Sequence, residues 1–134
     1  EPEIAKHWDW ENHNVELETI DAICNHACWL AIDIKAKFIV TLSKSGHTAS
    51  QISKNRAKTE IIVFTNKRKT RNQMAIVWGL HKVFYEETLD FKNPVELVRS
   101  RLKKEKLIKT NDEVVIVNAV RGSKERLITT FEVK

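Results

Sequence analysis

Apolar positions recur along this chain with two different periods, and their alternation predicts the order of its secondary structure. In residues 15–36 the apolar side chains recur every three to four positions, which is the spacing of one face of an α-helix. Residues 60–65 instead contain a short continuous apolar run, which is typical of a strand buried on both faces of a parallel sheet. By the same criteria, further helices are predicted at 45–55, 67–78 and 93–104, and further strands at 38–40, 82–85, 113–117 and 127–133.

This alternation predicts the fold class. Helices interleaved with the first four strands indicate an α/β fold with right-handed crossovers. No helix is expected between the last two strands, so the fifth strand can pair antiparallel at an edge. We therefore expect a three-layer α/β/α fold with a mainly parallel five-stranded sheet whose last strand is antiparallel.

The length of 134 residues predicts one domain, at 15–134, preceded by a lead-in segment at 1–14. The sequence begins with Glu1 rather than a methionine, and the lead-in segment contains Trp8 and Trp10. Two tryptophans in a terminal segment need something to cover them. We therefore expect further chain or a partner to pack against this segment.

Residues 43–48 join the first predicted strand to the second predicted helix and carry side chains that could bind an anion. Three hydroxyls, one lysine, one histidine and one glycine lie within these six residues. Gly46 lets the backbone approach a ligand closely, and the first N–H groups of a helix favour an anion. Hydroxyl groups and Lys44 would complete a phosphate site. The alternative is that Ser45 is only a helix N-cap and Thr48 a solvated residue of the first turn, because the loop is not a Walker A sequence.

The charge and composition restrict the possible partners. A net charge of +5 permits an anionic partner but does not identify one. The basic residues are spread over the chain apart from a dense run at 67–71, which no aromatic residues interleave, so we interpret that run as a solvated helix start. The chain is 42% hydrophobic and 31% charged, and it has no apolar run of the length that spans a membrane. We expect neither nucleic acid nor a membrane as a partner.

The cysteines and histidines predict no catalytic or metal site. Cys24 and Cys28 lie four residues apart on one helix face, where a disulfide is geometrically poor. Their spacing from His13 and His26 fits no zinc template. We therefore predict free thiols, no metal, and a reducing, cytoplasmic compartment. The five histidines have no nucleophile or acid at a recognisable spacing, so no catalytic residue is predicted.

Several short motifs, taken in order, resemble the C-terminal α/β domain of pyruvate kinase. The family pattern "AKAIVT-x-T-x-SG-x-TA-x-x-ISKYRPKAPIIAVT" is similar to AKFIVT at 36–41, SGHTA at 45–49, ISKNR at 52–56 and IIVFT at 61–65. MAIVWGL at 74–80 resembles the family's "LALVWGV", and KLIKTNDEVVIV at 106–117 resembles its "GLIKKGDLVVIV". The resemblance covers about residues 17–133.

The chain also departs from the family pattern. Ala57 and Glu60 stand where the family has prolines, and Asn111 stands where it has a glycine. The late connection at 118–127 is shorter than the family's and changed in sequence. In family members that sugar phosphates regulate, this connection closes over the effector.

The resemblance implies a regulatory and oligomerisation domain. Pyruvate kinases are glycolytic transferases that move phosphate from phosphoenolpyruvate to ADP in a separate barrel domain, with Mg²⁺ and usually K⁺. This segment alone is therefore expected to be inactive and to hold no cofactor. The resemblance implies a homotetramer, with the catalytic domain as one partner. Two alternatives remain: a stand-alone phosphate-ligand module of the same fold without kinase activity, and a basic scaffold or nucleic-acid binder.

The resemblance also implies an allosteric effector site, for a sugar phosphate or a nucleotide monophosphate, at the loop. Ser43, Ser45 and Thr48 would bind phosphate through their hydroxyls, with Lys44 as the charge partner. Gly46 would allow the close backbone approach, and His47 stands where a variable, often basic residue occurs. Further candidates, for a second phosphate, are Arg121 and Lys124.

Overall fold

The computed structural model describes residues 15–44, 46–54, 58–77, 82–119 and 126–134. Its elements follow in the order α2 (Val15–Asp33), β1 (Phe38–Leu42), α3 (His47–Lys54), β2 (Glu60–Thr65), α4 (Arg68–Val77), β3 (Val83–Tyr85), α5 (Val95–Lys104), β4 (Glu113–Asn118) and β5 (Leu127–Glu132). The order and the type of every described element agree with the prediction from the apolar pattern. The lead-in segment, with Trp8 and Trp10, lies outside the described residues.

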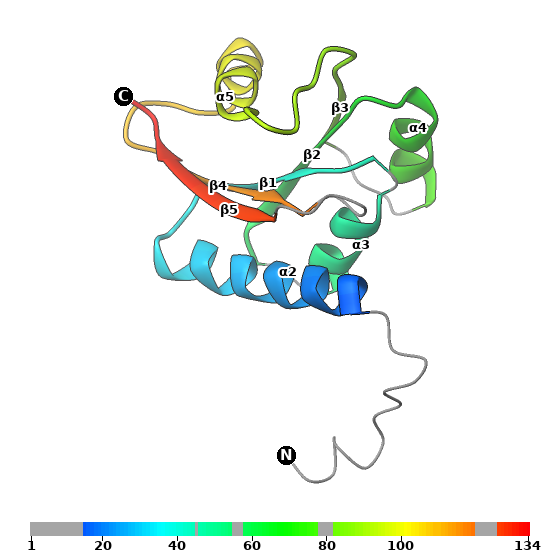
Figure 1. Ribbon diagram of the computed structural model, residues 1–134. Coiled ribbons are helices and arrows are strands. Elements are labelled where there is room, and N and C mark those ends of the chain that lie inside the picture. Colours follow the sequence, from blue (N-terminus) through cyan, green and yellow to red (C-terminus); the bar gives the residue numbers. More distant parts are fainter. Residues whose placement is uncertain (1–14, 45, 55–57, 78–81, 120–125) are drawn as a thin grey trace, which may run out of the picture.

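All five described strands form one sheet in the order β3-β2-β1-β4-β5 (Figure 1). β1 pairs in parallel with β2 on one side and with β4 on the other, and β2 pairs in parallel with β3. β5 runs antiparallel to β4, with Leu127 opposite Asn118. The predicted mainly parallel sheet with an antiparallel last strand is therefore confirmed.

Helices cover both faces of the sheet, which confirms the three predicted layers. Figure 1 shows α2 and α3 on one face and α5 on the other. Successive strand residues point to opposite faces. In β1, Ile39 packs in the cluster with Ile20 of α2 and Ile52 of α3, whereas Val40 packs in the cluster with Leu102 of α5.

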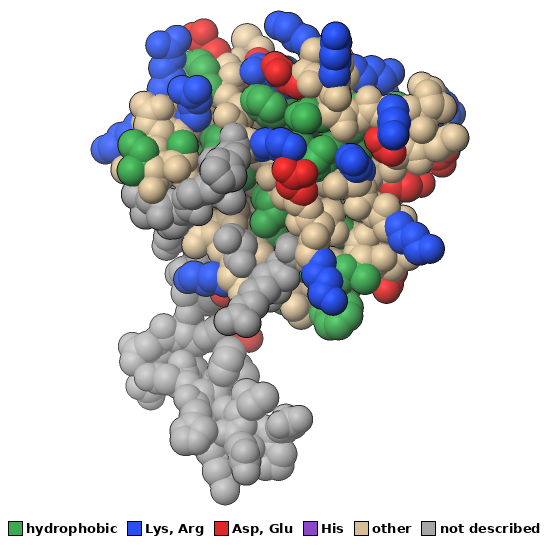
Figure 2. All heavy atoms as spheres, turned by 180° about the vertical axis from the view of Figure 1, so that it is seen from behind, with side chains coloured by type: hydrophobic (Ala, Val, Ile, Leu, Met, Phe, Trp, Pro, Cys, Tyr) green, Lys and Arg blue, Asp and Glu red, His purple; other side chains and the backbone are tan. Residues whose placement is uncertain are grey.

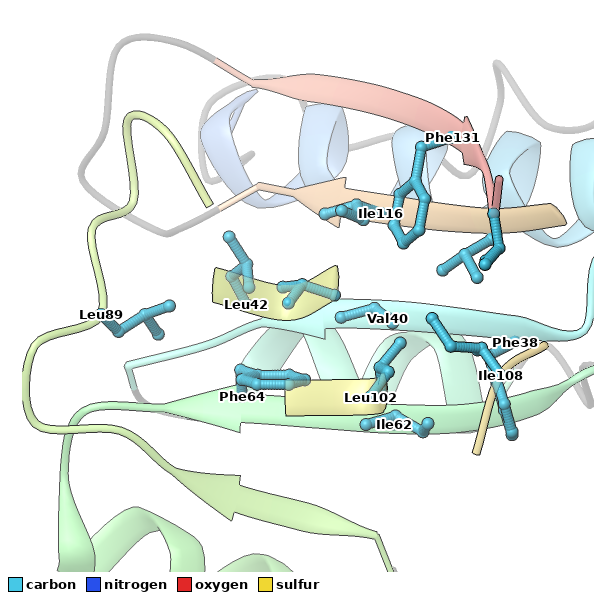
Figure 3. Packing of buried hydrophobic residues seen from close by; sticks show 13 residues of the cluster. Phe38, Val40, Leu42, Ile62, Phe64, Leu89, Leu102, Ile108, Ile116 and Phe131 are labelled. Atoms are coloured by element: carbon cyan, nitrogen blue, oxygen red, sulfur yellow. The ribbon is translucent and has the colours of Figure 1, made fainter. Parts of the chain in front are cut away.

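The core on the α5 face is the largest of the three hydrophobic clusters in the described part of the chain. Figure 3 shows side chains from β1, β2, β4 and β5 gathered with Leu102 of α5. The large side chains that are fully buried there are Phe38, Leu42, Ile62, Phe64 and Ile116. Removing such a side chain from water stabilises the fold by about 1.5–3 kcal/mol. Because all of β1 is buried, both cores hold this central strand, and the loop that follows it, in place.

Two helices end on a lysine with left-handed backbone geometry. Lys35 has φ 56° and Lys106 has φ 58°. The residues that follow donate back across the last turn, Ala36 N–H to Ala31 O at 2.9 Å and Leu107 N–H to Leu102 O at 3.0 Å, as in a Schellman cap. The first helix therefore ends at Asp33, before the predicted end at residue 36, because a left-handed residue cannot continue an α-helix.

Candidate functional site

The loop after β1 lies at the topological switch point of the sheet, where the strand order reverses. From β1 the chain passes through α3 to β2 on one side, and from β3 it returns through α5 to β4 on the other side of β1. Thr41 and Val117 are partners in the parallel pair, so the loops after β1 and β4 leave the sheet at the same edge. In open α/β sheets, ligands bind at this switch point, beyond the carboxyl ends of the strands.

Ser43 and Gly46 form a tight turn at the start of this loop. The Ser43 hydroxyl accepts a hydrogen bond from the Gly46 N–H at 2.7 Å, and the Ser43 N–H donates to Phe64 O at 3.0 Å. Gly46 has φ 92°, a conformation that a residue with a Cβ avoids. Its carbonyl accepts the N–H of Ser50 at 3.0 Å and so begins α3. The glycine is thus required by the turn itself.

Thr48 connects the loop to the end of β4. Its hydroxyl donates to the carbonyl oxygen of Ala119 at 3.0 Å, and its side chain is only 3% exposed. The interpretation of Thr48 as a solvated first-turn residue is therefore wrong. Because the hydroxyl proton is committed to Ala119, Thr48 can donate to a phosphate only after this bond opens. Ser43, at 2% exposure, keeps its own hydroxyl proton available because it acts as an acceptor toward Gly46.

Lys44 is the exposed cation of the loop. Its carbonyl accepts a hydrogen bond from the Thr70 hydroxyl of α4 at 2.6 Å, which fixes its backbone. Its Nζ lies 5.1 Å from the centre of the Phe91 ring, in the connection between β3 and α5. Asn118, at the end of β4, donates through its side-chain amide to Phe91 O. At the carboxyl edge of the sheet, Lys44 thus contacts α4 and the connection between β3 and α5, and this connection is in turn bonded to the end of β4.

The other predicted site residues are only partly placed. Ser45, Arg121 and Lys124 lie outside the described residues. The backbone of His47 begins α3, but its side chain is not among those that the structure describes. In the sequence, Arg121 and Lys124 follow Ala119, whose carbonyl oxygen accepts the hydrogen bond from Thr48. Binding of an effector by these residues stays a prediction.

Sequence reasoning missed Thr70, Phe91 and Ala119. Thr70 comes from α4, Phe91 from the connection between β3 and α5, and Ala119 from the end of β4, and each reaches the loop only through the order of the strands. The local sequence around these residues contains no signal for this contact, because a hydroxyl, an aromatic ring and a backbone carbonyl are common in any loop. Knowledge of the strand order would have placed Ala119 beside the loop.

The two cysteines of α2 are free and buried beside this region. The Cys24 thiol lies 3.8 Å from Thr48 O. Burial, followed by the charge of Asp21 and the neighbouring Cys28, raises the pKa of Cys24 to about 12. Burial also raises the pKa of Cys28. Both thiols are therefore protonated at neutral pH and are poor nucleophiles.

Neither a metal-ligand cluster nor a membrane-spanning helix is found in the described part of the chain. No group of three or more His, Cys, Asp or Glu side chains there is placed to hold a metal ion. Of the helices described, none combines the length and the apolar character needed to cross a membrane. What the edge does offer an anion is a fixed glycine turn, a helix start and an exposed lysine.

Comparison with known proteins identifies the family. The family model described as "Pyruvate kinase, alpha/beta domain" matches residues 21–133. Pyruvate kinase 1 of Trypanosoma brucei brucei is 35% identical over 104 residues, which cover 74% of this chain and 21% of that protein. The pyruvate kinase of Clostridium acetobutylicum is 31% identical over 91 residues, covering 68% of this chain and 19% of that protein.

A solved structure of a pyruvate kinase from Cryptosporidium parvum has the same fold, with a TM-score of 0.72 and 28% sequence identity. The match covers 86% of this chain and 23% of that one. The chain thus spans about a fifth of the length of the curated relatives that it matches. Sequence, strand order and fold agree with the resemblance in the motifs, and the chain belongs to the family of pyruvate kinase C-terminal α/β domains.

Proposed function

We propose that this chain is the regulatory and oligomerisation domain of a pyruvate kinase and that its 43–48 loop binds the phosphate group of an effector. The supporting observation is the place of the loop. It leaves the central strand at the switch point and is joined to the end of β4 by the bond from Thr48 to Ala119. A ligand at this point would contact connections from both halves of the sheet.

The loop offers three kinds of group to a phosphate. The first N–H groups of α3 have no partner within the helix, and the helix dipole favours a negative charge there. The ammonium group of Lys44, now over the Phe91 ring, is a mobile cation at the rim of the site. The Ser43 hydroxyl can donate its proton without giving up its bond from Gly46. Arg121 and Lys124 would approach from the connection after β4.

Phosphate transfer from phosphoenolpyruvate to ADP belongs, in this proposal, to the part of the protein outside this chain. Mg²⁺ and K⁺ would act there. The described residues of the loop supply binding groups but no carboxylate that could act as a general base. We expect no phosphotransfer by the 134-residue chain alone.

An exposed apolar face on α2 supports the assembly part of the proposal. Trp29 is 61% exposed and Ile32 is 41% exposed, one turn apart on the same helix. At this exposure Trp29 is not a core side chain, and we propose that it lies in an interface between subunits. Homotetramer formation through such faces, in the cytoplasm, is part of the proposal.

Charge distribution does not favour the nucleic-acid alternative. Figure 2 shows Lys and Arg side chains spread over the face that it presents, with Asp and Glu side chains between them. Surface ion pairs such as Lys82–Glu60 and Arg99–Glu96 follow the same mixed pattern. A phosphate-backbone binder would instead need a continuous basic stripe.

Calorimetric titration tests the proposed effector site. Fructose 1,6-bisphosphate, ribose 5-phosphate and AMP would be titrated into the protein and into Lys44→Glu. Because charge-assisted hydrogen bonds contribute about 1.5–3 kcal/mol each, reversal of the Lys44 charge should weaken binding by at least about tenfold. Lys103→Glu, an exposed position on α5, is the matched control and should bind as the wild type does. Binding of none of the three ligands, or equal binding by all variants, would contradict the proposal.

A further inference from the structure

A second cationic site lies beside β3, outside the proposed effector loop. A cavity of about 650 Å³ is lined there by residues of α4, β3 and α5. Its cationic side chains are Arg68 and Arg71 from α4 and Arg101 from α5. None of the described residues of the 43–48 loop lines it. A pocket of this size, with aromatic and arginine walls, is suited to a small organic anion.

One of the three arginines is already neutralised. Arg101 pairs with Glu86, and its Nε lies 3.1 Å from Glu105 Oε1. Its guanidinium also lies 4.6 Å from the centre of the Phe84 ring. Arg101 therefore lines the cavity, but its positive charge is already compensated by the two carboxylates.

Arg68 and Arg71 have no such compensation. Among the described residues, no carboxylate forms an ion pair with either of them. The Arg71 guanidinium donates a long hydrogen bond to the side-chain oxygen of Asn72, at 3.5 Å. The guanidinium of Arg68 lies 5.1 Å from the centre of the Tyr85 ring, a cation–π contact that leaves its N–H groups without a carboxylate partner among the described residues. Two positive forks thus face one cavity.

The basic run at 67–71 places several positive charges close together at the start of α4, which is electrostatically unfavourable unless an anion is bound. Four cations lie at 67, 68, 69 and 71, and the first turn of α4 contains no acidic residue. The helix dipole places positive charge at the same end, and cations one turn apart repel each other. Such a local conflict is expected where a site awaits a ligand of opposite charge. All four cations are exposed at the start of α4, as the interpretation of the run as a solvated helix start predicts, and the charge conflict is a further reason to expect a bound anion.

We propose that this cavity binds a small organic phosphate, with Arg68 and Arg71 bridging its phosphoryl group and with Phe84 and Tyr85 contacting its planar or apolar part. The two arginines lie three residues apart, so their side chains occupy the same face of α4. A phosphoryl group offers enough oxygens to accept from both forks at once. The site would be a second anion site of the domain, and it does not depend on the effector loop.

Titrating ¹⁵N-labelled protein with phenyl phosphate and with inorganic phosphate, followed by NMR, tests this site. Saturable shifts are expected at the amides of Phe84 and Tyr85 and at the Nε of Arg68 and Arg71. Phenyl phosphate should bind more tightly than inorganic phosphate because its ring adds contacts with the aromatic wall. Arg71→Ala should weaken binding by at least about tenfold, and Arg71→Lys, which keeps the charge but loses the fork, by less. Lys69→Ala, an exposed neighbour that does not line the cavity, is the charge-matched control and should bind normally.

Three results would overturn the second site: no saturable shift at β3, equal binding by Arg71→Ala and wild type, or shifts confined to Gly46 and Thr48. The last result would leave the effector loop as the phosphate site. Conversely, shifts at β3 that persist in Lys44→Glu would support the second site whatever happens at the loop. Because Arg71 is exposed, its variants should keep the wild-type circular dichroism spectrum, which removes unfolding as an explanation.

Discussion

Thr48 donates its hydroxyl hydrogen to the carbonyl oxygen of Ala119 at 3.0 Å, across 71 positions of sequence. This bond joins the first turn of α3 to the end of β4. The bond therefore holds the 43–48 loop beside the end of β4, the strand that precedes Arg121 and Lys124 in the sequence. A ligand that displaced this bond would reach both connections at once.

Removing the Thr48 hydroxyl should destabilise the fold. Thr48→Val keeps the shape of the side chain but leaves the Ala119 carbonyl without its donor, which we expect to cost about 1–3 kcal/mol. The free energy of unfolding, measured in urea, would show this loss. Thr48→Ser retains the hydroxyl and should stay closer to the wild type. If the valine variant is as stable as the serine variant, the bond does not hold the loop.

Replacing Lys35 by glycine should stabilise the protein. The left-handed backbone at φ 56° costs a residue with a Cβ about 1–2 kcal/mol. Glycine avoids this cost but has more freedom in the unfolded chain, so we expect a net gain of about 0.5–1 kcal/mol for Lys35→Gly. Thermal and urea unfolding would measure it. Lys37→Gly, two residues on and without a positive φ, should give no gain; equal gains in both variants would refute the helix-cap explanation.

Alkaline pH should weaken the fold through Cys24. Its pKa is 9.0 in the unfolded chain and about 12 in the folded protein, so above pH 9 the unfolded state loses the thiol proton first. Its contribution to stability is complete below pH 9 and falls by up to about 1.4 kcal/mol per pH unit between pH 9 and pH 12. We would compare unfolding at pH 8 and pH 10 under reducing conditions for the wild type and Cys24→Ala. The variant should lose less stability than the wild type; the same loss in both would contradict this assignment.

The exposed face of α2 should control assembly if it is an interface. Trp29→Glu introduces a charge where the proposal places a second copy, and we expect a smaller species in sedimentation velocity. Ile76→Glu is the control, because Ile76 is 82% exposed on α4 and lies outside the proposed interface. Trp29→Glu sedimenting as the wild type does would remove this face from the proposed assembly.

Most of the fold could be predicted because burial dictates the strand sequences. Each of the five residues of β1 is buried, and its first three residues, at 38–40, form the apolar run from which the strand was predicted. The end of α2 could not be predicted, because Lys35 takes the left-handed position where a glycine would have marked the cap, and the predicted helix continued to residue 36. The order of the strands leaves no local signal either, since it depends on which sheet edge each crossover reaches.

The candidate site could be predicted only in its local part. Gly46 and Lys44 follow a strand directly, and this local arrangement identified the loop. The burial of Ser43 and Thr48 could not be predicted, because both hydroxyls are satisfied by groups that tertiary structure brings near. Phe91 and Thr70 reach Lys44 from other connections for the same reason.

The most direct test of phosphate binding at the loop is the amide signal of Gly46 in ¹⁵N-labelled protein during titration with fructose 1,6-bisphosphate. Because the Gly46 N–H is bonded to Ser43 and begins the turn into α3, a ligand at the loop must change its surroundings. We expect a saturable shift of this signal that Lys44→Glu weakens by at least about tenfold and Lys103→Glu leaves unchanged. A Gly46 signal that does not move while the ligand binds elsewhere, or no binding at all, would contradict an effector site at this loop.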